Sequence, residues 1–447
     1  MVWRYAVSSK NFWATFYKKS QRNGMKVYKF GGASVKEAAG VRNLADIARS
    51  TEGRLFIVVS AMGKTTNALE KVMESFWNGR TGEAVVAMQG IVDYHAGILA
   101  DLWGEPHLPE RVRGFYEELE EIITLANPQS RTYEEWYDRI VSFGELISTA
   151  IVSDYLNFAG VGSHWLDMRR IFLTSNRFRD ANIDIEASTP RLRRAVELAD
   201  ERVVVGQGFI GATEQGATTT IGREGSDYSA AVAGYILEAE SVSIWKDVEG
   251  ILNGDPKQFE NVTYIPELTY LDAIELAYSG AQIIHPKTIK PLQNKNIPLY
   301  VRCFVNPSLP GSVIKSEISK PIDSPIFILK KGMILLSIKP EDYSFILEER
   351  MAEVFAILEK HRAKVHLVQN SAISMALCID PTRYLVEIVD ALHAAGFSVK
   401  YNTDMELLTI RGYRHEHLAE FVEAEDVYMT QRSRKVLRII RKSTSLG

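Results

Sequence analysis

An arginine and an aspartate lie in a glycine-rich turn within TTTIGREGSDYSAAVAG, residues 218–234. The glycines allow a sharp turn, and Ser226 or Asp227 can cap the helix of small residues that follows. Anions bind at the N-terminus of a helix because its N–H groups are free and its dipole is positive there. Capping does not require Arg223, so a capped surface helix and an anion-binding site both remain open from this stretch alone.

Three further stretches carry residues that suit a phosphate or an amino acid. KFGGAS (29–34) ends an apolar run in a glycine turn, where glycine N–H groups can approach phosphate and Lys29 can offset its charge. SAMGKTTN (60–67) is a second turn after an apolar run, and it is rich in hydroxyls. VSFGELIS (141–148) places Glu145 in a helix among apolar residues. Each stretch alone also fits a structural role, namely a surface turn, a helix cap or a half-exposed glutamate.

Strands that alternate with helices are predicted to carry these stretches. Apolar runs predict strands at 26–30, 54–61, 241–248 and 297–304 and a strand that begins at 202, and helical spacing predicts helices within 35–49, 64–126, 132–158, 227–238 and 271–281. This order is typical of an α/β fold with a mostly parallel sheet sandwiched by helices. Ligands of such sheets bind at the carboxyl ends of the strands. KFGGAS, SAMGKTTN and the turn before Asp227 all lie there.

The amino-acid composition changes near residues 305–325, where proline, serine and glycine are frequent, and this suggests a domain boundary. Shorter elements follow. Strands are predicted at 332–340, 363–369, 372–380, 397–402 and 406–412, with helices ending near 361 and spanning 381–396. This order indicates two imperfect copies of a small β-α-β-β unit. We expect a poorly ordered extension at 1–24, an α/β domain at 25–315 and an α+β region at 325–447.

Composition excludes several classes of protein. The chain has 447 residues, a net charge of −4 and no long basic run, which does not favour nucleic acid. Its two cysteines, Cys303 and Cys378, exclude a disulfide framework and lack the spacing of metal ligands. No apolar run reaches the roughly 18 residues of a membrane helix. We expect a cytoplasmic protein without a membrane segment or a protein-built metal site, and a transit-like or surface-binding role for 1–24 is the alternative.

Two motifs resemble nucleotide-binding signatures but lack their context. GQGFIG (206–211) matches the dinucleotide fingerprint, yet the following ATEQGATTT does not predict the helix that this fingerprint requires. SAMGKTT resembles the end of a P-loop, but Val58 stands where the first glycine is needed. Neither signature therefore predicts the function.

Together, the stretches resemble the aspartate kinases of the amino-acid kinase superfamily. The resemblance rests on KFGGASV, VSFGELIS, GFIGATEQGATTTIGREGSDYSAA, WKDVEGILNGDP, ELAYSGAQIIHPKTI and LPGSVI, which occur in the family's order. It covers about residues 25–315, and the C-terminal copies resemble the paired ACT domains of these enzymes. It implies an amino-acid kinase catalytic domain at 25–315 and an ACT-like regulatory and dimerisation region at 325–447.

The resemblance also implies a reaction and a set of site residues. The reaction is the ATP- and Mg²⁺-dependent phosphorylation of L-aspartate to 4-phospho-L-aspartate, the first step toward lysine, threonine and methionine. The family's ATP-binding positions match Lys29, Gly31, Gly32, Lys246, Asp247 and Lys257. Its aspartate-binding positions match Thr66, Glu145, Arg223, Ser226 and Asp227. Lys29 and Asp227 would form the catalytic pair, with Arg223 on the α-carboxylate.

The sequence departs from the family pattern at several positions, and two rival functions stay open. The residues that differ from those usual in the family are Ala33, Glu224, Lys246, Lys257 and Gln282, and they bear on nucleotide affinity. The first rival is another kinase of the superfamily, acting on glutamate, acetylglutamate or a nucleotide, which the FGELIS helix and the ACT-like tail disfavour. The second is a catalytically silent ACT-type amino-acid sensor, whose expected loss of Lys29 or Asp227 is absent.

Regulation is expected to reside after residue 325, where ACT-like units would pair in a homodimer and bind an amino-acid effector. Lysine-sensitive relatives usually carry acidic residues in the segment that matches 363–374, whereas this chain has His366 and Ala372. We therefore expect weak or absent inhibition by lysine. The alternative is that Asp404 or Glu406 supplies the missing charge.

Overall fold

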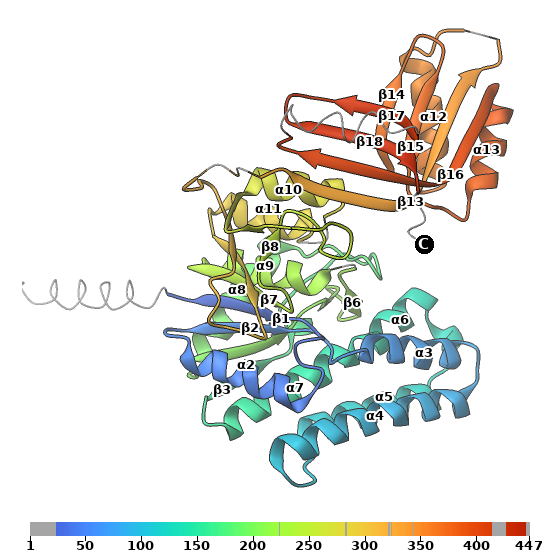
Figure 1. The fold of residues 1–447 in the computed structure, drawn as a ribbon. Coiled ribbons are helices and arrows are strands. Elements are labelled where there is room, and N and C mark those ends of the chain that lie inside the picture. Colours follow the sequence, from blue (N-terminus) through green and yellow to red (C-terminus); the bar gives the residue numbers. More distant parts are fainter. Residues whose placement is uncertain are drawn as a thin grey trace, which may run out of the picture. The chain divides into compact units, whose positions relative to one another are not determined.

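The structure is a computed structural model, and it describes residues 24–222, 224–281, 284–320, 322, 324–342, 344–413 and 426–443. The predicted poorly ordered extension lies outside these residues, except for Gly24. The described chain forms two compact units (Figure 1). The first unit comprises 24–251, 266–274 and 284–319, and the second comprises 252–265, 275–281 and the described residues from 320 onward.

An eight-stranded sheet forms the centre of the first unit, in the order β10-β12-β11-β7-β1-β2-β4-β3. Its strands are β1 (Lys26–Phe30), β2 (Leu55–Val59), β3 (Ser163–Leu166), β4 (Val203–Gln207), β7 (Ser241–Lys246), β10 (Glu267–Thr269), β11 (Leu299–Cys303) and β12 (Ser312–Lys315). The strands from β11 to β3 are all parallel, and only the β11–β12 pair is antiparallel. All of β2, with the sequence LFIVV, is buried, as expected for a strand covered on both faces. The predicted α/β sheet is confirmed.

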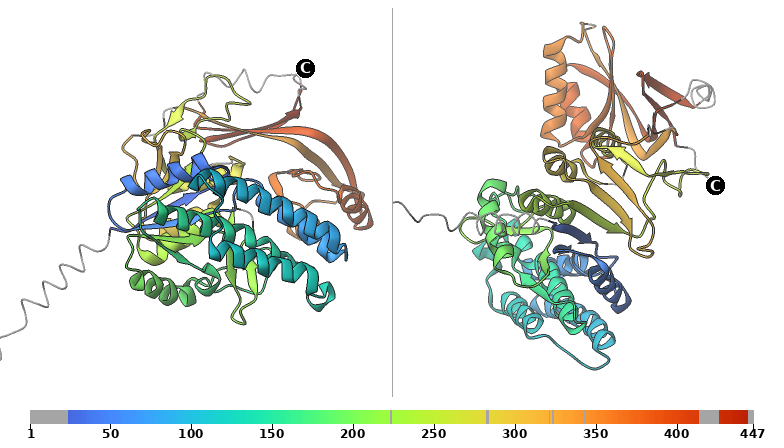
Figure 2. Two further views of the ribbon diagram at one scale, coloured as in Figure 1. Left: turned by 90° about the horizontal axis from the view of Figure 1, so that it is seen from below. Right: turned by 90° about the vertical axis from the view of Figure 1, so that its left-hand side faces the viewer.

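Helices cover both faces of this sheet (Figures 1 and 2). On one face, α7 (Phe143–Phe158) packs against β2 and β4, and α2 (Ala38–Ser50) packs against α7. On the other, α9 (Gly225–Leu237) packs against β1, β2 and β7, flanked by α8 (Ile185–Leu198) and α11 (Pro286–Asn294). The small residues of α9 make the helix narrow. A Cβ on Gly234 would lie 2.5 Å from Cγ2 of Val242. The glycine therefore allows the helix and the sheet to approach closely.

Four helices extend this unit beyond the sheet: α3 (Thr65–Trp77), α4 (Thr81–Trp103), α5 (Glu110–Leu125) and α6 (Tyr133–Val141). The first three occupy 64–126, where two or three helices were predicted. The single helix predicted for 132–158 is wrong, because α6 ends at Val141 and α7 begins at Phe143. Between them, the Ser142 hydroxyl donates to the carbonyl oxygen of Arg139. The break allows α6 to pack on α3 while α7 packs on the sheet.

The GQGFIG motif ends β4 and leads into a hairpin of β5 (Ile210–Ala212) and β6 (Thr218–Thr220), so no helix opens after it. Its glycines serve close packing. A Cβ on Gly208 would lie 2.5 Å from Cβ of Ser226, at the N-terminus of α9. The rejection of the dinucleotide fingerprint is therefore consistent with the fold.

The second unit is built on a six-stranded antiparallel sheet in the order β14-β15-β13-β16-β18-β17. Its elements are β13 (Ile326–Pro340), α12 (Glu348–Lys360), β14 (Val365–Asn370), β15 (Met375–Ile379), α13 (Leu385–Ala394), β16 (Phe397–Arg411), β17 (Val427–Arg432) and β18 (Val436–Lys442). Leu336 and Ile338 of β13 pack with Val354 of α12 and Ile388 of α13, so both helices lie on one face of the sheet.

Two predictions for the second unit need correction. The strands predicted at 397–402 and 406–412 are the single 15-residue strand β16. Asp404 has a φ of 53° and lies where the pairing with β13 shifts register, so the polar segment is a bulge and not a turn. The basic run RSRKVLRIIRK also contains a strand, β18, which the sequence did not predict. Leu437 and Ile439 of β18 pack in a core cluster with Leu408 and Ile410 of β16.

The contact between α9 and β7 predicts opposite effects for the same substitution at two helical glycines. Gly234→Ala should lower the free energy of unfolding by about 1–3 kcal/mol, because the new methyl overlaps Val242. Gly114→Ala on the exposed side of α5, where a Cβ meets no atom within 4 Å, should raise it by about 0.5–1 kcal/mol. Chemical denaturation of both variants measures the difference. Equal effects at the two sites would contradict the close packing of α9.

Candidate active site

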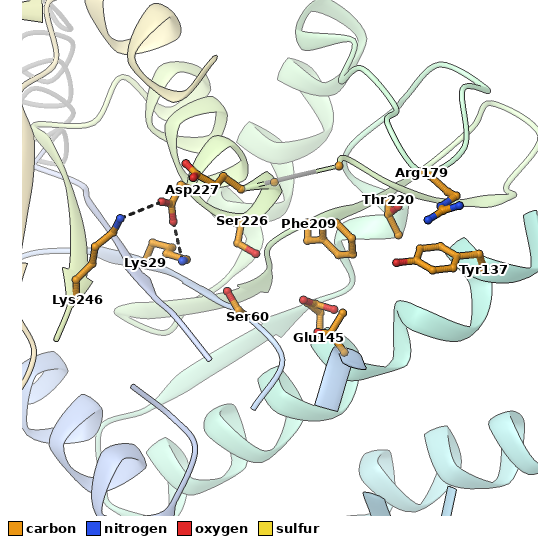
Figure 3. A pocket seen from close by; sticks show the side chains of 14 residues that line it. Lys29, Ser60, Tyr137, Glu145, Arg179, Phe209, Thr220, Ser226, Asp227 and Lys246 are labelled. Carbon is orange, nitrogen blue, oxygen red and sulfur yellow. Dashed lines mark ion pairs between the residues drawn. The ribbon is translucent and has the colours of Figure 1, made fainter. Parts of the chain in front are cut away.

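The carboxyl ends of β1, β2 and β7 and the N-termini of α7 and α9 surround a cavity of about 550 Å³ (Figure 3). The predicted site residues that line it are Lys29, Thr66, Glu145, Ser226, Asp227 and Lys246. The sequence stretches that carry them are far apart along the chain, and the parallel sheet brings them to one edge. The cavity is therefore the candidate active site.

A buried carboxylate joins two lysines at one end of the cavity. Nζ of Lys29 lies 2.6 Å from Oδ1 of Asp227, and Nζ of Lys246 lies 4.0 Å from Oδ2. Asp227 is in the first turn of α9 and is 4% exposed. Burial raises its pKa, but the charges of Lys29 and Lys246 outweigh burial and hold the pKa below its ordinary value. The carboxylate is thus ionised and fixes two ammonium groups in the cavity, an arrangement suited to phosphate.

Two glycine turns meet beside this lysine pair. The N–H of Gly63 donates to the carbonyl oxygen of Gly32 at 3.0 Å, and a Cβ on Gly32 would overlap the carbonyl oxygen of Ala61. The turn after β1 can therefore approach the turn after β2 only with glycine at this position. The hydroxyl of Tyr94 on α4 donates to the carbonyl oxygen of Lys36 and so braces the first turn from outside.

Glu145 lies in the first turn of α7, not in the middle of a long helix as predicted. Its Oε1 accepts a hydrogen bond of 3.3 Å from the N–H of Ala61, while its buried Oε2 has no hydrogen-bond partner. Burial raises the pKa of Glu145 to about 8, against smaller lowering effects of hydrogen bonds and of Lys29. A buried carboxyl oxygen without a donor, on the wall of a cavity, suits an incoming ammonium group.

The cavity also has lining residues that were not predicted as site residues: Ser60, Tyr137, Arg179, Phe209 and Thr220. Ser60 lies in the predicted SAMGKTTN turn, so its motif pointed to it. Phe209 and Arg179 have φ angles of 66° and 67°, which sequence patterns do not reveal. Glu224 also lines the cavity, with a φ of 55°, and glycine would adopt this conformation with less strain.

Other predicted residues lie elsewhere. Gly31, Gly32 and Asp247 belong to the turns after β1 and β7 but are not among the lining residues of the cavity. Lys257 belongs to the second unit, where its N–H donates to Oδ1 of Asp255. Arg223 and Gln282 lie outside the described residues. The nucleotide-binding roles of these glycines, Asp247 and Lys257, and the carboxylate-binding role of Arg223, stay predictions.

Comparison with known proteins identifies the family. Residues 24–303 match the model of the Amino acid kinase family. The chain is 33% identical over 361 residues to the lysine-sensitive aspartokinase 3 of Escherichia coli K12, covering 80% of this chain and 78% of that protein. It belongs to the aspartokinases of the amino acid kinase family. It is also 33% identical to the chloroplastic aspartokinase 1 of Arabidopsis thaliana over 80% of its own length, and it spans 63% of that protein.

Solved structures agree with this membership. The chain is similar to E. coli aspartokinase III in complex with aspartate and ADP, with a TM-score of 0.78 and 29% identity over 94% of this chain and 96% of that one. The aspartate kinase of Clostridium acetobutylicum, at 21% identity and a TM-score of 0.75, shares the fold. In the described part of the chain, none of the helices is both long enough and apolar enough to cross a membrane.

The raised pKa of Glu145 predicts a pH-dependent effect of Glu145→Gln. Because the folded-state pKa of about 8 lies above the ordinary 4.5, the proton stabilises the fold below pH 4.5, and this stabilisation is lost as pH rises through about 8. The amide does not titrate. The variant should therefore gain stability relative to the parent between pH 6 and pH 9, by at least the roughly 1.4 kcal/mol of one pKa unit.

Denaturant titrations at pH 6, 7.5 and 9 measure this gain, with Glu117→Gln on the exposed side of α5 as the control. A stability difference between the Glu145 variant and the parent that does not change with pH would show that Glu145 is not buried as a proton-binding group.

Proposed function

We propose that this chain transfers the γ-phosphoryl group of ATP to the side-chain carboxylate of L-aspartate, giving 4-phospho-L-aspartate. The observation that carries the proposal is one cavity with two lysines on Asp227 at one end and an unpartnered oxygen of Glu145 in its wall. Lysines suit phosphate, and a carboxylate suits the ammonium of an amino acid. Similarity to an aspartokinase solved with aspartate and ADP supports these two ligands.

The reaction needs no general base in this cavity. The side-chain carboxylate of aspartate has a pKa of about 3.9 and is ionised at neutral pH. One of its oxygens bonds to the γ-phosphorus, the bond from phosphorus to the oxygen that bridges to the β-phosphate breaks, and ADP leaves with that electron pair. Lys29 and Lys246 offset the charge on the transferring group, and Asp227 holds both lysines in place beforehand.

The remaining predicted residues have supporting roles in this proposal. The nucleotide would contact Gly31, Gly32 and Asp247, and aspartate would contact Thr66, Glu145, Ser226 and Arg223. Thr66 in the first turn of α3 and Ser226 in the first turn of α9 both line the cavity and can donate hydrogen bonds to an anion. Glu224 places a negative charge in the same lining, which would weaken nucleotide binding.

Magnesium would enter with the phosphates of ATP, as it does in most phosphoryl-transfer sites. In the part of the chain that the structure describes, no three His, Cys, Asp or Glu side chains cluster to hold a metal ion. Asp227 already pairs with two lysines, so the ATP phosphates and water would supply most of the oxygen ligands. Bound Mg²⁺ would neutralise charge on the phosphoryl group.

The rival functions fit the cavity less well. A silent sensor does not require two lysines held on one buried aspartate beside a cavity. A glutamate or acetylglutamate kinase would share the phosphate end, but the aspartokinases at 33% identity favour aspartate as the acceptor. We also propose that the product enters the synthesis of lysine, threonine and methionine, and that the protein acts in the cytoplasm.

ADP release across a panel of acceptors tests the proposed function. The purified chain should release ADP from MgATP with L-aspartate, and hydroxylamine should trap the product as an aspartyl hydroxamate. L-glutamate, N-acetyl-L-glutamate and UMP, at the same concentration, should give less than a tenth of that rate. Faster ADP release with any of these three acceptors than with aspartate would overturn the proposal, and so would the absence of a hydroxamate.

We further propose that the second unit is an ACT-like region through which two copies of the chain form a homodimer. β14 is an edge strand whose residues Gln369 and Asn370 are exposed. Phe345 and Leu347, which are 63% and 61% exposed, flank Ile346, whose N–H donates to the carbonyl oxygen of Ala372 beyond that strand. A second copy would cover these apolar side chains.

The charges around His366 bear on effector binding. Nε2 of His366 lies 2.6 Å from Oδ1 of Asp380, and its Nδ1 lies 3.2 Å from Nζ of Lys330. Lys330 and His366 therefore already lie near the carboxylate of Asp380. Glu406, one alternative source of the missing negative charge, is 1% exposed, and its carboxylate accepts hydrogen bonds from Arg441 and Ser443. Of the two alternatives, Glu406 is therefore already paired, whereas Asp404 is exposed.

Titration of L-lysine against the initial rate checks this expectation. Because His366 and Ala372 stand where acidic residues are usual in lysine-sensitive relatives, the lysine ammonium loses a charge-assisted hydrogen bond worth roughly 1.5–3 kcal/mol, a ten- to hundredfold loss in affinity. We predict that half-inhibition requires more than about a millimolar lysine. Matched additions of L-alanine control for ionic and solvent effects. Half-inhibition in the micromolar range would show that a tight lysine site exists in this chain.

A further inference from the structure

Arg179 has an unusual backbone conformation at the wall of the cavity. Its φ of 67° lies in the left-handed region, which costs a non-glycine residue roughly 1–2 kcal/mol. The N–H of Arg179 donates to both carboxylate oxygens of Asp138, at 3.1 and 3.0 Å. Strained residues persist where the surroundings hold them, and such strain clusters at functional sites. The strained conformation of Arg179 at the cavity wall therefore suggests a functional role for this residue.

Asp138 fixes this part of the wall. It is 0% exposed, and its carboxylate also accepts hydrogen bonds from the N–H and the hydroxyl of Thr220, at 2.7 and 2.6 Å. One buried side chain on α6 thus holds the loop of Arg179 and the end of β6 together. The same loop packs on the turn before α9, since a Cβ on Gly222 would lie 2.9 Å from Oδ1 of Asp180.

The side chain of Arg179 is held as well, at the wall of the cavity. Its guanidinium lies 4.3 Å from the ring centroid of Tyr137, and the hydroxyl of Tyr137 donates to Glu70. Among the described residues, no carboxylate forms an ion pair with this guanidinium. Stacking on an aromatic ring fixes the plane of an arginine while its N–H groups stay free for a planar anion.

The cavity consequently has a cation at each end. Figure 3 shows Lys29, Lys246 and Asp227 on one side, Arg179, Tyr137 and Thr220 on the other, and Glu145 between them. In the proposed reaction the side-chain carboxylate of the substrate must face the phosphoryl group at the lysine end. The α-carboxylate of the same amino acid then points away from the lysines, with its ammonium within reach of Glu145.

We infer that Arg179 is a substrate-binding residue that recognises the α-carboxylate of the amino acid, and that Asp138 is the positioning residue that holds Arg179 in place. The inference rests on the proposed function, because that function orients the substrate. It adds a second arginine to the role that family resemblance gives to Arg223. It also makes the free α-carboxylate a determinant of specificity.

Substitution of Arg179 by asparagine tests the inference, because asparagine tolerates a positive φ and removes the guanidinium from the cavity wall. The variant Arg179→Asn should raise the KM for L-aspartate ten- to hundredfold, the loss expected for one charge-assisted contact. The KM for ATP should change by less than about threefold, and kcat should fall much less than the affinity. Arg179→Lys should give an intermediate KM, since lysine keeps the charge but loses the planar fork.

The matched control is Arg177→Asn. Arg177 lies two residues away in the same loop, is 72% exposed at its side chain and pairs with Asp180, so its loss removes the same charge outside the cavity. This control should leave the KM for aspartate unchanged. Asp138→Asn should raise the KM for aspartate and leave the KM for ATP unchanged, because the amide places N–H groups where two donors already point.

A substrate analogue isolates the α-carboxylate. L-isoasparagine, the α-amide of aspartate, keeps the side-chain carboxylate that accepts phosphate. The parent enzyme should favour aspartate over this amide at least tenfold in kcat/KM, and Arg179→Asn should reduce that preference severalfold. Melting temperatures within about 2 °C of the parent would show that the variant folds.

The outcomes separate the inference from the proposed function. If the parent enzyme shows no aspartate-dependent turnover, the proposed function fails, and with it the orientation on which the inference depends. If the parent enzyme phosphorylates aspartate but Arg179→Asn keeps both its KM for aspartate and its preference over the amide, the inference alone is wrong. Equal losses in kcat for aspartate and the amide without a change in KM would also overturn it.

Discussion

The buried carboxylate of Asp227 is the constraint on which the first unit depends. An ionised group that is 4% exposed costs several kcal/mol to bury unless cations and hydrogen bonds compensate it. Lys29 at the end of β1 and Lys246 at the end of the neighbouring β7 supply the cations, and the N-terminus of α9 adds its dipole. Two strands and one helix must therefore meet at this edge of the sheet, which places the cavity there.

The small residues of α9 follow from that constraint. The helix carries Asp227 in its first turn, so its axis has to lie close to β1 and β7. Gly234 allows contact with Val242, and Gly208 allows the turn after β4 to approach Ser226. The same geometry explains why GQGFIG resembles a dinucleotide fingerprint. Its glycines provide room for protein packing instead of room for a pyrophosphate group.

Sequence patterns predicted the parts of the molecule where one physical signal dominates. Short continuous apolar runs such as LFIVV are typical of strands that are covered on both faces, and glycine turns after them predicted the edge that holds the cavity. Six predicted residues line that cavity because their motifs follow strands or open helices. The predictions of helix and strand bounds failed where tertiary contacts determine those bounds. One predicted helix is divided at Ser142, where α6 packs on α3 and α7 packs on the sheet, and a bulge at Asp404 joins two predicted strands.

The cavity residues that sequence reasoning missed share a cause. Arg179 and Phe209 have positive φ angles that glycine would usually provide, and Tyr137 lines the cavity from α6, which packs on α3. The spacing of residues in the sequence does not predict a positive φ angle, because neighbouring elements impose that conformation. Arg223 lies outside the described residues, and its role is the one that family resemblance implies.

A double-mutant cycle on Lys29 and Asp227 tests the central claim most directly, that one buried carboxylate positions the lysine that neutralises the phosphoryl group. The cycle compares kcat for aspartate-dependent ADP release in Lys29→Ala, Asp227→Asn and the double variant. If the two residues act as one unit, each single change should lower kcat on the order of 10²–10³-fold, and the double variant should be no more than a few-fold slower than the worse single variant. Losses that multiply, or near-normal turnover in Asp227→Asn, would contradict the account.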